Sequence, residues 1–320
     1  MTTSSLRRVR VAEVEPVASR IKRFRLVSAD DTPLTQFSGG SHVTVCMNAK
    51  DRSFRNPYSL LSDPRDPSSY EIGVLRVPDS RGGSEYMHDR VSVGSELEIS
   101  APLNLFPPAR MARKHILVAG GIGITPFMSM MSELDALGAD FELHYGVRSL
   151  DEGAFCKLLQ QRYGARVSIY AQDNNQLVPL ERLLEAQPLG AHMYVCGPKP
   201  MIDWAIRTAT LSGWPRENIH SEQFTAPPGG RPFVAKLNRS ARDITVGGHQ
   251  SILEALEQNG IEAPFLCRGG ACGQCETSVV ACDGVIEHND HYLTEAEKAA
   301  GRKIMICVSR ISGSAVTLDL

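Results

Sequence analysis

The 320-residue sequence lacks a long hydrophobic run, a strong charge of either sign, and any tandem repeat or low-complexity tract. Its formal net charge of −2 argues against a general nucleic-acid binder. The longest uncharged run, 115–132, contains four turn-forming Gly and Pro residues, which indicates strand, turn and helix instead of a membrane span. No apolar segment follows the basic N-terminus, so we expect no secretory signal and a cytoplasmic protein.

The composition, with 42% hydrophobic and 22% charged residues, provides for two or three globular domains. The segment TAPPGGRP, 225–232, holds paired prolines and paired glycines and therefore predicts a linker. A second, less distinct domain boundary is predicted near FPPAR, 106–110. We expect domains at 1–108, 109–226 and 236–320, with 227–235 as the linker.

Eight cysteines without an export signal suggest a reducing compartment and a cofactor role. Four of them have the plant-type spacing of a 2Fe–2S cluster, with four, then two intervening residues and a distant fourth: Cys267, Cys272, Cys275 and Cys307. The small residues between them let backbone N–H groups approach the sulfurs. The alternatives are structural zinc, which favours two similar short pairs, disulfides, which need an oxidising compartment, or buried thiols.

Residues 1–108 contain several short alternating segments with Gly, Pro and Asp between them, which predicts a closed or nearly closed antiparallel β-barrel. Within it, FRNPYSLLS supplies an arginine for a phosphate, a tyrosine for an aromatic ring and a serine that can donate to a ring nitrogen: Arg55, Tyr58 and Ser59. A barrel strand with a surface arginine and a core tyrosine is the alternative interpretation.

A second stretch of this region, DSRGGSEYMHDR at 79–90, has a glycine turn that opens a short helix and is a ready anion site. Gly82 and Gly83 form the turn, and Ser84 is predicted to cap a helix over 85–89. A plain loop and helix that close the barrel are the alternative. Together with Arg76 on the preceding strand, the two stretches indicate a phosphate-bearing ring cofactor.

Residues 109–226 alternate strands and helices, which predicts a parallel α/β sheet. In HILVAGGIGITPF a buried strand leads into a glycine turn, and Thr125 is predicted to cap the helix that follows. Close helix–strand packing is the alternative reason for the glycines, and a packed thiol is the alternative for the strand-end cysteine. Ligands bind such sheets at the carboxyl ends of strands, where these candidates fall: Gly121, Gly123, Thr125, Arg148, Asp173, Cys196, Gly197 and Pro198.

The last stretch, 236–320, indicates a small α+β domain in which a helix capped by Ser251 precedes the cluster loop. It holds eight basic and eleven acidic residues, a formal charge of −3. These acids form either a solvated surface or a docking face for a basic redox partner.

The segments RNPYSL, RGGS, GGIGITP, YVCGPKPM and SEQF, with the cysteine pattern, resemble the ferredoxin–NADP reductase superfamily. The domain order resembles its phthalate dioxygenase reductase and vanillate demethylase reductase group. The resemblance covers essentially the whole chain. It implies an FMN-binding antiparallel barrel, a pyridine-nucleotide α/β domain, a plant-type ferredoxin domain of the β-grasp type, and a Rieske-type terminal oxygenase as electron acceptor.

By position, the resemblance also implies flavin contacts for Arg55, Tyr58, Ser59 and the 82–84 turn. It implies nucleotide contacts for 121–125 and 196–198, and a place near the flavin ring for Phe224. The usual motif has one residue between its arginine and tyrosine, whereas Asn56 and Pro57 both intervene here.

For the nucleotide, Asp173 at a strand end would repel a 2′-phosphate and hold a ribose hydroxyl, and no arginine cluster follows it, which favours NADH. The positive charge of Arg148 is the feature that argues against this preference. The sequence thus predicts an NADH-dependent oxidoreductase that passes electrons through flavin and cluster to a separate oxygenase. We expect no acid–base catalyst. A stand-alone NADH oxidase, a ferric or quinone reductase and a redox-sensing binding protein are the alternatives.

Overall fold

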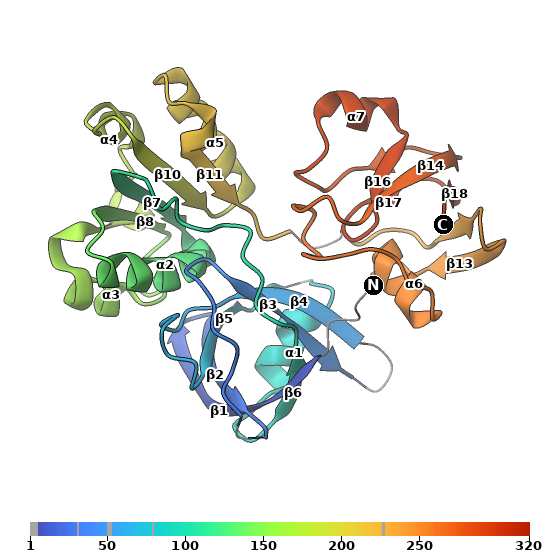
Figure 1. Ribbon diagram of the computed structural model, residues 1–320, viewed down its shortest axis with the longest axis horizontal. Helices are drawn as coiled ribbons and strands as arrows, with labels where there is room; N and C mark the ends of the chain where they lie inside the picture. Colours follow the sequence, from blue (N-terminus) through green and yellow to red (C-terminus); the bar gives the residue numbers. More distant parts are fainter. Residues whose placement is uncertain (1–5, 31, 50–52, 79, 226–227) are drawn as a thin grey trace. The chain divides into compact units, whose positions relative to one another are not determined.

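The computed structural model describes residues 6–30, 32–49, 53–78, 80–225 and 228–320 (Figure 1). These residues form two compact units, Met1–Gln223 and Phe224–Leu320. Asp79, Ala226 and Pro227, which belong to stretches discussed above, lie outside the described residues.

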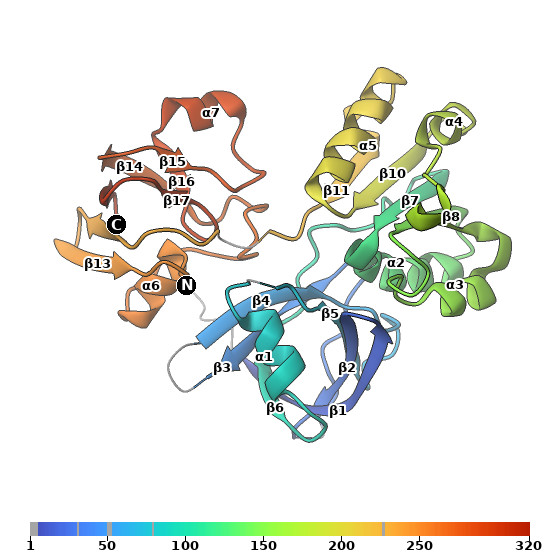
Figure 2. The same ribbon diagram turned by 180° about the vertical axis from the view of Figure 1, so that it is seen from behind.

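The N-terminal half of the first unit is a six-stranded antiparallel sheet in the order β4-β3-β6-β1-β2-β5. A bridge between Leu60 and Ile72 joins its two edges, so the predicted barrel is confirmed. Apolar side chains alternate into its core, and helix α1 packs against β3, β4 and β5 (Figure 2). The bounds are β1 Arg7–Ala18, β2 Ile21–Ser28, β3 His42–Asn48, β4 Ser53–Ser59, β5 Tyr70–Leu75, α1 Gly83–Arg90 and β6 Glu96–Ile99.

The second half of this unit is a parallel sheet in the order β11-β10-β7-β8-β9, which confirms the predicted α/β architecture. Helices α2 and α3 cover one face and α4 and α5 the other (Figure 1). The bounds are β7 Lys114–Gly120, α2 Thr125–Ala136, β8 Phe141–Val147, α3 Cys156–Tyr163, β9 Val167–Ala171, α4 Leu180–Glu185, β10 Ala191–Cys196, α5 Lys199–Leu211 and β11 Ile219–Glu222.

The barrel and the parallel sheet meet where a barrel loop packs against α2. The N–H of Gly40 donates to Ser129 Oγ at 3.1 Å, and the N–H of Gly39 donates to the Glu133 carboxylate. A Cβ at Gly39 would lie 2.7 Å from the Cα of Met130, so there is no room for a side chain. The two halves are therefore joined through backbone contact.

The second unit is a mixed sheet in the order β13-β12-β18-β14-β16 with a small β15-β17 pair, in line with the predicted α+β ferredoxin domain. Ser251 caps α6 as predicted, in a capping box with Glu254. Strand β12 begins at Phe233, inside the stretch expected to be linker. The bounds are β12 Phe233–Leu237, β13 Arg242–Val246, α6 Ile252–Gln258, β14 Glu276–Cys282, β15 Ile286–Glu287, α7 Glu295–Ala300, β16 Lys303–Met305, β17 Arg310–Ile311 and β18 Ala315–Leu318.

Candidate functional site

Strand β4 carries the motif expected to bind flavin, and its register decides which side chains act together. It pairs with β3 without a bulge, from Asn48 opposite Ser53 to His42 opposite Ser59. Because side chains alternate along a strand, Tyr58 shares a face with Asn56, while Arg55 lies on the opposite face. The extra residue in the motif therefore separates Arg55 from Tyr58.

Ser59 fits a bound ring because its hydroxyl has no hydrogen-bond partner among the residues that the structure describes. The residue is only 4% exposed, and its Oγ is buried without a hydrogen bond among the described residues. Buried polar atoms are almost always paired, so an orphan at this strand end fits a ligand that supplies the missing bond. Beside it, burial raises the pKa of Tyr58 to about 12, which keeps that phenol neutral.

The predicted anion turn is present, but Ser84 does not cap its helix. Helix α1 begins at Gly83 with Gly82 as its N-cap, and Gly82 has a φ of 108°, a conformation that favours glycine. The prediction of a Ser84 cap is wrong, because Ser84 already lies inside the first turn. There its Oγ accepts a hydrogen bond from the Val77 N–H at 3.3 Å and ties α1 to the end of β5.

Arg76 lies next to α1 and is held by it. Its two terminal nitrogens lie 2.6 and 2.9 Å from the carboxylate oxygens of Asp89 in a two-pronged pair. Both side chains are about half exposed. The structure thus brings Arg76 to the predicted turn region but engages its guanidinium with a carboxylate of the same helix.

The nucleotide turn and the end of β10 lie against each other, as expected for neighbouring parallel strands. A Cβ at Gly123 would collide with the carbonyl of Cys196, and one at Gly120 would lie 3.0 Å from Pro198. Gly121 and Gly123 open a 3₁₀ turn, Gly121–Ile124, and Thr125 is the first residue of α2. The predicted Thr125 cap is wrong, because its hydroxyl donates to Ile122 O at 3.0 Å.

Arg148 and Asp173 meet through the backbone at the ends of β8 and β9. The N–H of Asp173 donates to Arg148 O at 3.0 Å, while the Arg148 side chain is 74% exposed and 4.0 Å from Glu152. Tyr145, fully buried on β8, donates its hydroxyl to Gly121 O at 3.0 Å. Tyr145 therefore links β8 to the glycine turn.

Glu222 is a residue at this sheet edge that sequence reasoning missed. It ends β11 opposite Cys196, and its Oε2 is buried without a hydrogen-bond partner among the described residues. Burial raises the pKa of its carboxyl to about 8, and burial together with this carboxyl raises the pKa of the Cys196 thiol. The only sequence signal was an acid at a strand end in SEQF.

The four predicted cluster cysteines form two thiol pairs within the second unit. Cys275 Sγ lies 3.1 Å from Cys307 Sγ, and the neighbouring Cys272 thiol lowers the pKa of Cys267. The Gly269 N–H donates to Cys267 Sγ at 3.4 Å and lowers the pKa of this thiol further. In the described part of the chain, no three His, Cys, Asp or Glu side chains gather around a single-metal site. Two pairs fit a two-iron cluster, in which each iron takes two thiolates.

The cluster loop is held in place from both sides. Arg268 has a φ of 55° and is 8% exposed; its guanidinium pairs with Glu257 of α6 at 3.1 Å and lies 4.1 Å from the centre of the Phe265 ring. On the other side, a side chain at Gly273 would collide with the ring of Tyr292, which is itself half exposed. Arg268 and Tyr292 were not predicted, since neither is a ligand.

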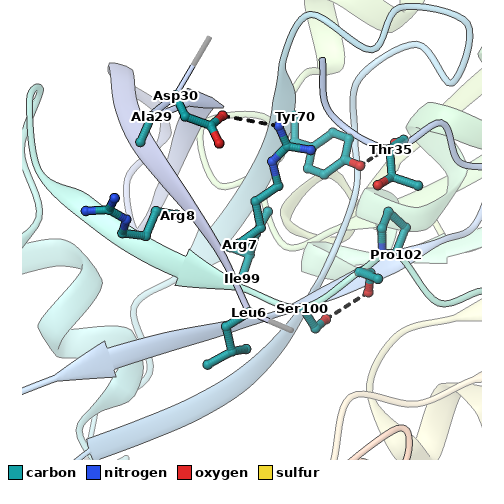
Figure 3. A pocket seen from close by; sticks show the side chains of 11 residues that line it. Leu6, Arg7, Arg8, Ala29, Asp30, Thr35, Tyr70, Ile99, Ser100 and Pro102 are labelled. Atoms are coloured by element: carbon teal, nitrogen blue, oxygen red, sulfur yellow. Dashed lines mark hydrogen bonds and ion pairs between the residues drawn. The ribbon is translucent and has the colours of Figure 1, made fainter. Parts of the chain in front are cut away.

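One hollow on the barrel surface, about 390 Å³ in volume, lies apart from these residues (Figure 3). It is lined by Arg7, Asp30, Thr35 and Tyr70, and Arg7 is already paired with Asp30 at 3.5 Å. None of the predicted cofactor residues lines it. Among the described residues, no helix is long and apolar enough to cross a membrane.

The comparisons with known proteins match two regions of the chain to family models. Residues 235–312 match the 2Fe-2S iron-sulfur cluster binding domain. Residues 102–219 match the N-terminal domain of dimethylamine monooxygenase subunit DmmA-like proteins.

Whole-length similarities extend over both units. The chain is 44% identical to the carnitine monooxygenase reductase subunit of Acinetobacter baumannii, covering 97% of this chain and 96% of that protein. It is 43% identical to the heme-dependent oxidative N-demethylase beta subunit of Ectopseudomonas mendocina, covering 99% and 100%. The solved structure of phthalate dioxygenase reductase superposes with a TM-score of 0.89 at 34% identity, covering 99% and 98%.

Proposed function

We propose that this chain, which belongs to the family of oxygenase reductase components that includes phthalate dioxygenase reductase, uses NADH and FMN to reduce a Rieske-type oxygenase through its 2Fe–2S cluster. Electron transfer from a pyridine nucleotide through flavin and a 2Fe–2S cluster to an oxygenase is the activity of the family. The observation that carries the proposal is that the four cysteines lie in two pairs, Cys267 with Cys272 and Cys275 with Cys307. The same chain carries the strand predicted to bind flavin and the glycine turn predicted to bind a nucleotide.

Within this function, the residues of the chain bind and orient. When bound, the flavin supplies the step from two-electron to one-electron transfer. Tyr58 presents a neutral phenol, and the Ser59 hydroxyl has no partner within the described part of the chain; both suit a ring that lies along the end of β4. Gly121 leaves open space beside the turn for a nucleotide, and Gly123 lets the turn pack directly against the Cys196–Gly197 backbone.

FMN is proposed because the domain order resembles the phthalate dioxygenase reductase group. For the nucleotide, Asp173 supports NADH, since a carboxylate at the end of β9 would repel a 2′-phosphate. The exposed Arg148 guanidinium is the feature that would favour NADPH instead. Steady-state rates with both nucleotides decide this point, and a kcat/KM that is higher with NADPH would contradict the proposal.

The electron acceptor has two candidates. A Rieske-type oxygenase, in a reducing cytoplasm, follows from the resemblance and from the acidic ferredoxin unit, which suits a basic partner. A heme-dependent N-demethylase is the second candidate, because the chain is 43% identical to the beta subunit of such an enzyme and matches the DmmA-like model. Adding catalytic subunits of each class to the reductase and NADH, and measuring coupled product formation, distinguishes them.

The first test is the visible absorption spectrum of the purified protein before and after anaerobic addition of NADH. Flavin bands and broad iron–sulfur absorption that both bleach would support the proposed path. Flavin absorption without iron–sulfur absorption, in protein prepared anaerobically with iron, would contradict it. Rapid NADH consumption with oxygen, ferric chelates or quinones that no oxygenase accelerates would favour a stand-alone reductase, and negligible turnover a redox sensor.

A further inference from the structure

Strand β4 presents Asn56 to the turn that opens α1, and we propose that Asn56, instead of Arg55, is the β4 side chain that binds the flavin phosphate. The inference rests on the proposed flavin-binding function of the barrel. It changes the assignment made from the motif alone, in which the arginine carries the phosphate contact. Three observations support it: the strand register, the contact with the turn and the chemistry of the side chain.

The register places Asn56 where an arginine stands in the usual motif. An arginine separated from the tyrosine by one residue shares its face of the strand, because side chains alternate with a period of two. Here the residue two before Tyr58 is Asn56, and β4 pairs with β3 continuously, with no bulge to reset the alternation. Arg55 is three residues from Tyr58 and lies on the other face, with Pro57 and Ser59.

The contacts show that this face meets the glycine turn. A Cβ at Gly83 would lie 3.0 Å from Asn56 Cγ and would collide with the amide nitrogen. A Cβ at Gly82 would lie 3.0 Å from the ring of Phe54, which is two residues before Asn56 on the same face. Asn56 Nδ2 donates to Tyr58 Oη at 3.2 Å. Asn56 thus lies between the ring-binding tyrosine and the first residue of α1.

The side chain has bonding capacity left for an anion. An asparagine amide carries two N–H donors, and Tyr58 takes one of them. Among the described residues, none accepts the second. A neutral amide would act beside the backbone N–H groups at the start of α1, so the phosphate would be held by hydrogen bonds more than by a paired charge.

The test is flavin titration of the apoprotein, followed by fluorescence, with FMN and with riboflavin, which has no phosphate. We expect Asn56→Ala to weaken FMN binding about tenfold, the effect of losing one hydrogen bond to a charged group. Asn56→Asp, which preserves the shape but places a carboxylate at the phosphate, weakens it further. Riboflavin affinity changes less than about threefold in both, since only the phosphate contact is altered.

Two further variants complete the design. Arg55→Gln tests the competing assignment and leaves FMN affinity within about threefold if Asn56 is the phosphate ligand. Ser53→Ala, at the exposed start of the same strand, is the matched control. Thermal unfolding of each apoprotein identifies variants that fail to fold, and Asn56→Ser replaces Asn56→Ala if the latter does.

The outcomes distinguish a failure of the Asn56 assignment from a failure of the proposed flavin-binding function. A tenfold loss of FMN affinity in Arg55→Gln with none in Asn56→Ala overturns the inference alone. Equal weakening of FMN and riboflavin in the Asn56 variants also overturns it, because the side chain would then act on the ring or the fold. Wild-type protein that binds neither FMN nor FAD would overturn the proposed function itself.

Discussion

Strand β4 and the cluster loop, 267–275, each carry three or more of the proposed cofactor contacts, and they respond differently to sequence change. In the loop, spacing sets three ligands, of which Cys267 and Cys272 lie together and Cys275 pairs with Cys307 from outside the loop. In the strand, one extra residue moves Arg55 to the other face while every strand pair is kept. In a loop, motif spacing therefore predicts which side chains bind a cofactor. In a strand, it predicts only which of the two faces a side chain lies on, according to whether the spacing is odd or even.

The strongest test of this comparison removes one ligand from the loop. Cys272→Ser should abolish assembly of the cluster, because one iron loses one of its two thiolates. We expect cytochrome c reduction to fall at least about a hundredfold, while NADH oxidation with a flavin-level dye stays within about twofold. Cys282→Ser, outside the pattern, is the control. Unchanged cytochrome reduction in Cys272→Ser would remove the cluster from the path.

The next test removes a side chain that holds the cluster loop in place and leaves the four cysteine ligands unchanged. Arg268→Ala should destabilise the ferredoxin unit by about 3 kcal/mol, because it removes a largely buried ion pair with Glu257 and the contact with the Phe265 ring. Urea unfolding and the iron content after dialysis measure this. The exposed Arg302→Ala, just before β16, is the matched control and should behave as wild type. If Arg268→Ala retains its iron and its stability, then spacing alone holds the loop.

A smaller effect is expected at the nucleotide turn. Tyr145→Phe removes the hydroxyl that donates to Gly121 O, so KM for NADH should rise about fivefold with kcat within about twofold, the size of one lost hydrogen bond. Tyr170→Phe on β9, whose hydroxyl bonds to His144 at 3.0 Å, is the matched control. A fall in kcat without a change in KM would assign Tyr145 to a different step.

The last expected effect concerns the pH dependence of stability. The pKa of Glu222 is raised to about 8 in the folded chain, above its ordinary value of 4.5. Its contribution to stability is therefore complete below pH 4.5 and is lost as the pH rises through 8. Urea midpoints of wild type and Glu222→Gln at pH 6 and pH 9 measure this, and the wild type should lose more. Equal losses would show that Glu222 is ionised at neutral pH.

Much of the fold and part of the site could be predicted from the sequence, and the reasons are local. Strand alternation, the capping box at Ser251 and the spacing of the first three cluster cysteines each lie within a few neighbouring residues. The displaced cap at Ser84 shows that a helix start is predictable only to within a residue or two, because turn glycines extend it.

The remainder depends on partners distant in sequence. Asn56 acquires its position from its register with β3 and its contact with α1. Glu222 acquires its raised pKa only because β11 is placed beside Cys196. Arg268 is recognisable as a support only when α6 brings Glu257 to it. Such properties follow from packing and not from composition or spacing.

The contact of Gly39 and Gly40 with α2 also limits how this reductase can evolve. At Gly39 a side chain would meet the backbone of Met130, so a larger residue there would push the barrel away from the nucleotide sheet, and no side chain could be trimmed to make room. The distance between the proposed flavin-binding surface of the barrel and the proposed nucleotide-binding edge of the sheet is thus expected to stay constant as the sequence changes. Changes in nucleotide preference must accumulate instead at the strand ends, where Arg148 and Asp173 can be replaced without moving a backbone.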